Sequence, residues 1–194
     1  MKHLKNYFTK NRVIAALRNS EEFRKALWSD AILLFVLSGD ISSLSKMMEE
    51  ARKYDKLIFL HIDLIKGIAA DKAGIKFLAD NNLCDGIVST KSNLIKEAQK
   101  WDLMAVQRLF LLDSASLNSG ENMIKNNEPD AIEILPGIAA PYFIDHVSNI
   151  NDCPVIAGGL IREKEEINKL IEKGVMAISS SDHHLWNYKL EDKS

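Results

Sequence analysis

Short apolar runs alternate with longer amphipathic segments along the whole 194-residue chain. Eight of these runs have the length and composition of buried strands: Arg12–Leu17, Ala31–Gly39, Leu57–Asp63, Gly86–Thr90, Met104–Phe110, Ala131–Gly137, Pro154–Gly159 and Met176–Ser181. Most are too short and too apolar for strands that have one face in water. The pattern therefore predicts parallel strands that are buried on both faces.

The segments between the runs have helical periodicity. From Asp40 to Asp55, and again from Lys91 to Asp102, apolar residues recur at steps of three and four. A third such segment ends on Gly174, a residue type that commonly terminates helices. About eight repeated strand–helix units predict an α/β fold, namely a closed, parallel (β/α)8 TIM-like barrel. At this length the barrel is minimal. We expect a single domain over 1–194, with the barrel at about 12–186 and a frayed, polar tail at 187–194.

Composition narrows the possible functions. The chain is 46% hydrophobic and 27% charged, with a net charge of -2 and a pI near 6.2, which argues against a strongly basic nucleic-acid module. No apolar run approaches a membrane span, and the N-terminal segment has no secretory apolar core. Cys84 and Cys153 show no CxxC or Cys/His spacing, so we expect small buried residues in a reducing cytoplasm.

Glycines and hydroxyls end the last two predicted strands. Loops after the seventh and eighth strands of such barrels often bind phosphate, and glycines let backbone amides approach an anion closely. A short helix that opens at Ser181–Asp182 would direct its amides at the same anion. The alternative is that the glycines merely allow a tight turn. The predicted phosphate-binding residues are Gly158, Gly159, Ser179, Ser180 and Ser181.

Other polar residues lie within or just after the remaining strands. Glu133 stands in the middle of an apolar run, where an isolated carboxylate would be costly, so it must be paired or protonated. Its partner could be Lys91, Arg108 or His61, and the alternative to a ligand site is a structural ion pair inside the barrel. The predicted polar cluster at the barrel mouth is His61, Asp63, Lys91, Gln107, Arg108 and Glu133.

Metal and covalent chemistry are not predicted. His183 and His184 are adjacent, so on a helix their side chains should diverge and fail to hold a metal together. Lys91 could form a Schiff base, but a phosphate contact or a helix start explains it equally. We assign no catalytic residue, no metal and no cofactor.

Five segments together are similar to one known family: "HIDLIKGIAADKAGIKFL", "DGIVSTKSNLIKEAQK", "VQRLFLLDSASL", "PDAIEILPGI" and "PVIAGGLI". The chain resembles the glycerol-3-phosphate-responsive antiterminators, the glycerol uptake operon antiterminator regulatory proteins, from about Val13 to Trp186. The matched positions are His61, Asp63, Lys66, Ser89, Thr90, Lys91, Gln107, Arg108, Asp113, Glu133, Gly158, Gly159 and Ser179 to Ser181. The segments "FVLSGD" and "SDHHLW" depart mildly from the family pattern.

The resemblance implies a TIM-like barrel that senses glycerol 3-phosphate as its effector. It also implies action on the messenger-RNA leader of glycerol-catabolic genes, with read-through of a terminator and a more stable transcript. RNA-contacting residues remain unassigned, because the sequence has no RRM, KH or aromatic-platform signature. Lys91, Lys96, Lys100, Arg162 and Lys164 could form a basic rim at the mouth, or simply solvated helix faces. A homo-oligomer is possible.

The fold alone favours a different class, because most barrels that bind phosphate catalyse a reaction. The alternative function is therefore an isomerase, aldolase or lyase that acts on a small phosphorylated substrate. A scaffold barrel without a ligand is a third option.

Overall fold

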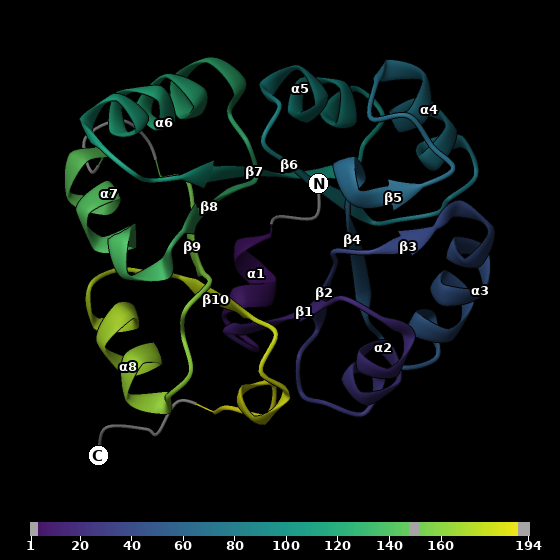
Figure 1. Cartoon of the computed structure of the whole chain (residues 1–194), viewed down its shortest axis with the longest axis horizontal. Helices are drawn as coiled ribbons and strands as arrows, with labels where there is room; N and C mark the ends of the chain where they lie inside the picture. Colours follow the sequence, from purple (N-terminus) through teal and green to yellow (C-terminus); the bar gives the residue numbers. More distant parts are fainter. Residues whose placement is uncertain (1–3, 148–151, 190–194) are drawn as a thin grey trace.

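A computed structural model describes residues 4–147 and 152–189, and these residues contain a closed parallel barrel (Figure 1). Its strand order is β1-β10-β9-β8-β7-β6-β4-β2, which closes when β2 pairs with β1. The strands are β1 Val13–Leu17, β2 Leu33–Val36, β4 Leu57–His61, β6 Gly86–Ser89, β7 Met104–Phe110, β8 Ala131–Leu135, β9 Val155–Gly158 and β10 Ala177–Ser180. Each lies within one of the eight predicted runs, and the (β/α)8 barrel is confirmed.

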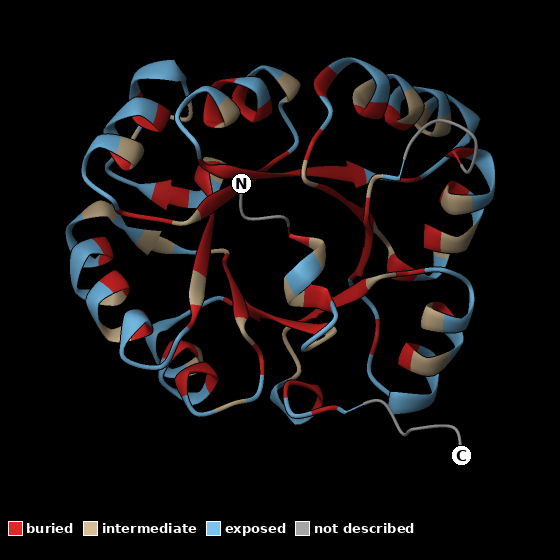
Figure 2. Cartoon of the chain, turned by 180° about the vertical axis from the view of Figure 1, so that it is seen from behind, coloured by how far each residue is buried: buried red, intermediate tan, exposed pale blue. Residues whose placement is uncertain are grey.

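Helices surround the barrel and cover the outer faces of its strands (Figure 1). They are α2 Ser20–Leu27, α3 Ile41–Arg52, α4 Lys72–Asp80, α5 Ser92–Lys100, α6 Ser114–Asn127, α7 Ala140–Val147 and α8 Lys164–Glu172. The predicted periodicity holds in α3, where Leu44, Met48 and Ala51 are buried. Figure 2 shows the result, with buried residues on the strands and inner helix faces and exposed residues outside. One apolar layer thus lies between helices and strands.

A second apolar cluster fills the barrel itself. Alternate strand residues point inward, so Phe35, Phe59 and Val88 meet in the interior. The short helix α1, Lys5–Phe8, lies within the ring of strands in both views (Figures 1 and 2) and contributes Phe8, which is 1% exposed. Since α1 directly precedes β1, it closes the barrel at the N-terminal ends of the strands.

Two short strands were not predicted. β3, Gly39–Asp40, and β5, Ile65–Lys66, pair in parallel as a separate two-stranded sheet. A 3-10 turn, η1 at Ile62–Leu64, separates β5 from the barrel strand β4. The predicted runs Ala31–Gly39 and Leu57–Asp63 therefore extend past the ends of β2 and β4, because the chain leaves the barrel after Val36 and His61.

The C-terminal segment also departs from the prediction of a frayed tail that starts at residue 187. Tyr188 is buried at 6% exposure, and Asn187 Oδ1 accepts a hydrogen bond from the Asp30 amide at 2.8 Å. Lys189 forms an ion pair with Asp30 at 3.4 Å. Residues 187–189 thus pack on the barrel, whereas 190–194 lie outside the described residues. Within the described ranges, no helix is both long and apolar enough to cross a membrane.

Candidate ligand site at the barrel mouth

Polar side chains form a layer inside the barrel at the C-terminal ends of the strands, here called the mouth. Strand alternation places His61, Arg108, Glu133 and Ser179 on the inner face, directly above the apolar interior. All four are buried, with exposed fractions from 0% for Glu133 to 7% for His61 and Arg108. The position matches the end at which (β/α)8 barrels bind ligands.

Glu133 is held by two partners. Arg108 Nε donates to Glu133 Oε2 at 2.6 Å, and Ser179 Oγ donates to Glu133 Oε1 at 2.5 Å. Both carboxylate oxygens are therefore satisfied, which is what full burial of a charged group requires. The prediction that Glu133 must be paired is confirmed with Arg108 as the cation. The role of Ser179 as the second partner was not predicted.

Gly158 makes this pairing possible. A Cβ on Gly158 would lie 2.6 Å from Ser179 Oγ and 2.7 Å from Glu133 Oε1, so any side chain would displace the hydrogen-bonded groups. Gly159 differs, since it is exposed with a positive φ of 76° and its nearest neighbour, Leu135 Cδ2, would be 3.6 Å away. Gly158 therefore has a structural role, and Gly159 leaves open backbone at the mouth.

His61 carries an unsatisfied nitrogen. Its Nδ1 is buried, has no hydrogen-bond partner among the described residues, and lies 3.8 Å from Asp63 Oδ2. Burial and the nearby Arg108 cation lower the pKa of the imidazole, and the opposing carboxylates of Asp63 and Glu133 do not compensate. A neutral imidazole with an unpaired buried nitrogen has an unused hydrogen-bonding atom, and leaving that atom unpaired costs the free protein stability.

A second polar network lies at the rim of the mouth. Lys91 Nζ contacts Asp63 Oδ1 at 2.7 Å, and Ser89 Oγ donates to Asp63 Oδ2 at 2.9 Å. Burial opposes ionisation of Asp63, but the hydrogen bonds from Lys91 and Ser89 outweigh it and lower the pKa of the carboxyl. The Lys91 side chain is 52% exposed, so the rim presents to solvent an ammonium group that Asp63 holds in place.

Two predicted residues lie outside the barrel interior. Gln107 faces the helix layer, where Ser92 Oγ donates to its Oε1 at 3.2 Å and its Nε2 donates to the Ser89 carbonyl at 3.2 Å. Ser180 also points outward, and its Oγ accepts the Asp182 amide at 3.1 Å. Gln107 thus faces away from the barrel interior, although its partners Ser89 and Ser92 lie at the mouth end of β6, and its part in the cluster stays a prediction. Both residues lie beside inward-facing neighbours, and period-two alternation explains their orientation.

The two strand ends predicted to hold phosphate are neighbours. β9 pairs with β10, with Gly158 opposite Ser179. The helix expected at Ser181–Asp182 is instead a three-residue 3-10 turn, η3 at His183–Leu185. Its His184 amide donates to Asp182 Oδ1 at 3.0 Å, so a carboxylate already occupies the end that was expected to bind an anion. Gly159 and half-buried Ser181 remain the accessible members of the predicted set.

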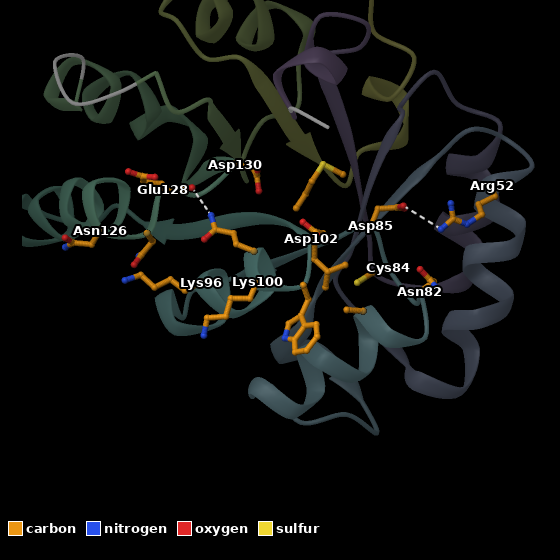
Figure 3. Close-up of a pocket in the computed structure, with 16 residues that line it drawn as sticks. Arg52, Asn82, Cys84, Asp85, Lys96, Lys100, Asp102, Asn126, Glu128 and Asp130 are labelled. Carbon is orange, nitrogen blue, oxygen red and sulfur yellow. Dashed lines mark hydrogen bonds and ion pairs between the residues drawn. The ribbon is translucent and has the colours of Figure 1, made fainter. Parts of the chain in front are cut away.

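The proposed basic rim is only partly present at the mouth. Lys96 and Lys100 line a hollow of about 980 Å³ at the opposite end of the barrel, between the N-terminal ends of β6, β7 and β8 (Figure 3). Three basic residues line it beside four acidic ones, and Arg52 lies 3.8 Å from Asp85. Cys84 also lines it, and burial raises the pKa of this thiol to about 12. Size alone does not make this mixed-charge hollow the better ligand site, because the converging buried polar groups are at the mouth.

Two matched residues lie away from the buried polar layer. Asp113 caps α6, where its Oδ1 accepts the Ser116 amide at 2.8 Å and Ser116 Oγ accepts the Asp113 amide at 3.0 Å. Lys66 is exposed, and it stands opposite Asp40 in the backbone register of the two-stranded sheet. Neither lies in the buried polar layer, so matching the family pattern does not by itself indicate ligand contact.

The closed barrel and its polar mouth define the chain as a small (β/α)8 protein with a buried polar layer at the end where such barrels have their sites. Residues 13–186 match the family model described as glycerol-3-phosphate responsive antiterminator, and the chain belongs to this family. A curated relative, the uncharacterized protein YgcP of Escherichia coli K12, is 33% identical over 176 residues, which is 91% of this chain and 92% of the relative.

Solved structures agree with this assignment. The glycerol uptake operon antiterminator regulatory protein of Listeria monocytogenes is 35% identical, with a TM-score of 0.85 over 92% of this chain and 96% of that one. A glycerol uptake operon antiterminator-related protein of Thermotoga maritima is 30% identical, with a TM-score of 0.79 over 91% and 98%. An aldolase with 11% identity and a TM-score of 0.70 shares the fold only.

Proposed function

We propose that this protein is a glycerol-3-phosphate-responsive transcription antiterminator, which binds the messenger-RNA leader of glycerol-catabolic genes. On binding its effector it promotes read-through of a terminator and stabilises the transcript. We place this activity in the cytoplasm, in line with two free cysteines in the described structure. The observation that carries the proposal is the buried polar layer at the mouth, with its unpaired His61 nitrogen, in a chain of this family.

The chemistry of the mouth suits a small dianion with hydroxyl groups. Lys91 supplies an exposed positive charge at the rim, and the backbone at Gly159 is open to an approaching anion. His61 Nδ1 offers an unused hydrogen-bonding atom for a hydroxyl. Glycerol 3-phosphate would thus place its phosphate at Gly159 and its hydroxyls towards the buried layer.

A thermal-shift titration with glycerol 3-phosphate tests effector binding. Ligand at about 100 times its Kd should stabilise the wild type by about 2.7 kcal/mol. Gly159→Asp should lose this stabilisation, because its carboxylate would repel the phosphate. Gly159→Asn is the matched control: it has the same shape and backbone demand without the charge, so it should retain the shift. If the Asp and Asn variants respond alike, the phosphate is not bound at Gly159.

A mobility-shift assay with leader RNA tests the second half of the proposal. A ligand can act as a switch only if it binds the RNA-competent state more tightly than the other. RNA affinity should therefore rise when glycerol 3-phosphate is added, and the rise should be absent in Gly159→Asp. Equal RNA affinity with and without the ligand would rule out effector control.

The only support for the enzyme alternative is likeness of fold to barrel enzymes such as an aldolase. Lys91, the lysine considered for covalent chemistry, is half exposed, and its amine is held in a salt bridge to Asp63. We therefore propose a regulator and not a catalyst. NMR of glycerol 3-phosphate or dihydroxyacetone phosphate incubated with the protein should show no product, and any product would favour the enzyme.

A further inference from the structure

Three potential metal-binding side chains meet beside the mouth, in the segment Asp182–His184. We expected the two histidines to diverge, but η3 is a 3-10 turn and their ring centroids lie 4.1 Å apart. One donor atom from each of Asp182, His183 and His184 falls within 4.8 Å of the others. The expectation that the His183 and His184 side chains diverge, which assumed a regular helix, is therefore wrong.

The donors are accessible and chemically suited to one class of ion. Both histidines are exposed, and Asp182 is partly exposed. Asp182 Oδ1 accepts the His184 amide, whereas Oδ2 has no hydrogen bond among the described residues. Two imidazole nitrogens and one carboxylate oxygen form a ligand set typical of zinc and related divalent transition metals, with other coordination positions left open.

Buried anchors hold this turn in place. Trp186 is 1% exposed and its indole Nε1 donates to the Ser180 carbonyl at 2.8 Å, while Leu185 is 3% exposed. The Asp182 amide is fixed by Ser180 Oγ at 3.1 Å. Because the backbone is anchored on both sides, only side-chain rotation is needed to bring the donors around one ion.

We propose that Asp182, His183 and His184 bind a divalent transition-metal ion of the zinc type, with water in the remaining coordination positions. The site lies one residue beyond Ser181, at the rim of the mouth. It uses side-chain donors only and does not depend on glycerol 3-phosphate, so it goes beyond the proposed antiterminator function.

Calorimetric titration of untagged, chelator-treated protein with zinc chloride tests the site. The wild type should bind one ion, and the double variant His183→Ala/His184→Ala should lose that binding. Replacing a single metal-binding side chain should weaken zinc binding at least about tenfold. Loss of a residue that only hydrogen-bonds to a metal ligand already weakens metal binding by that factor. His146→Ala is the matched control, because His146 is also exposed and lies 3.0 Å from a carboxylate of Glu121. It should bind zinc like the wild type.

A second variant guards against a folding defect. Asp182→Asn keeps an oxygen that can cap the His184 amide but removes the charge. It should remain folded and bind zinc more weakly. Cobalt binding, followed by visible absorption, should show the same order of variants. Absence of zinc binding in the wild type, or equal binding in the double variant, would overturn the proposal, and neither outcome bears on effector binding.

Discussion

At the residue scale, the mouth combines satisfied and unsatisfied polar groups. Glu133 has a partner for each oxygen, whereas the buried His61 nitrogen has none in the described structure. Unpaired buried polar atoms cost about 1 to 3 kcal/mol, and their persistence commonly indicates a functional role. We therefore expect His61 to weaken the free protein and to be satisfied when ligand binds.

His61 should make stability depend on pH. Its pKa is lowered in the folded protein, so its contribution to stability is full above the unfolded pKa of about 6.5 and is lost as pH falls through the folded value. His61→Asn, which cannot take up this proton, should show a flatter decline in unfolding free energy between about pH 7 and 5. Urea denaturation at each pH measures this. Equal slopes for both proteins would show that His61 does not titrate differently on unfolding.

The two adjacent glycines should respond differently to alanine. At Gly158 the new Cβ would displace Ser179 Oγ or Glu133 Oε1, at a cost of about 1 to 3 kcal/mol for overpacking plus the disturbed hydrogen bonds. At Gly159 space is available, and only the positive φ of 76° costs energy, about 1 kcal/mol. Chemical denaturation of both variants checks the order. A smaller loss for Gly158→Ala would contradict the proposed role of that residue.

At the element scale, the eight barrel strands were predictable because each is a short, fully buried run between amphipathic segments. The two-stranded sheet was not predictable. β3 and β5 have two residues each, which is too short for a strand pattern, and Gly39 of β3 already belongs to the run that precedes it. Gln107 and Ser180 show the same limit at the site, since composition identifies a polar residue on a strand but not the face on which it lies.

A helix cap explains one of the residues that match the family pattern, without any role in ligand binding. Asp113 matches the family pattern, yet its carboxylate caps α6. Asp113→Ala should cost about 1 kcal/mol of unfolding free energy, which is typical for a lost N-cap. The thermal shift with glycerol 3-phosphate should be unchanged relative to the wild type. Loss of that shift in a folded variant would show that Asp113 also contributes to ligand binding.

At the scale of the whole molecule, the two ends of the barrel are closed differently. Leu4 and Phe8 fill the barrel at the N-terminal ends of the strands with apolar atoms. The mouth, at the C-terminal ends, has charged and polar side chains instead. The middle of the barrel is packed with apolar side chains, so no open channel is expected to connect the ends. The N-terminal end of the barrel thus contributes stability through apolar packing, and the polar groups that we propose for ligand binding lie at the mouth.

This division predicts the behaviour of Phe8→Ala. Removing a fully buried aromatic ring should cost about 3 to 5 kcal/mol of unfolding free energy, because α1 can relax only partly into the cavity. Asn6→Ala, an exposed change on the same helix, should cost little. Urea denaturation compares the three proteins.

The Phe8→Ala variant should nevertheless respond to glycerol 3-phosphate like the wild type. Ligand stabilisation depends only on concentration relative to Kd, and the polar layer lies at the opposite end of the packed interior. Its melting temperature should be lower than that of the wild type both with and without glycerol 3-phosphate. The gain in unfolding free energy on adding the ligand should be the same in both proteins. If that gain disappears while Asn6→Ala keeps it, the barrel transmits changes along its axis, and the mouth depends on the helix that closes the other end.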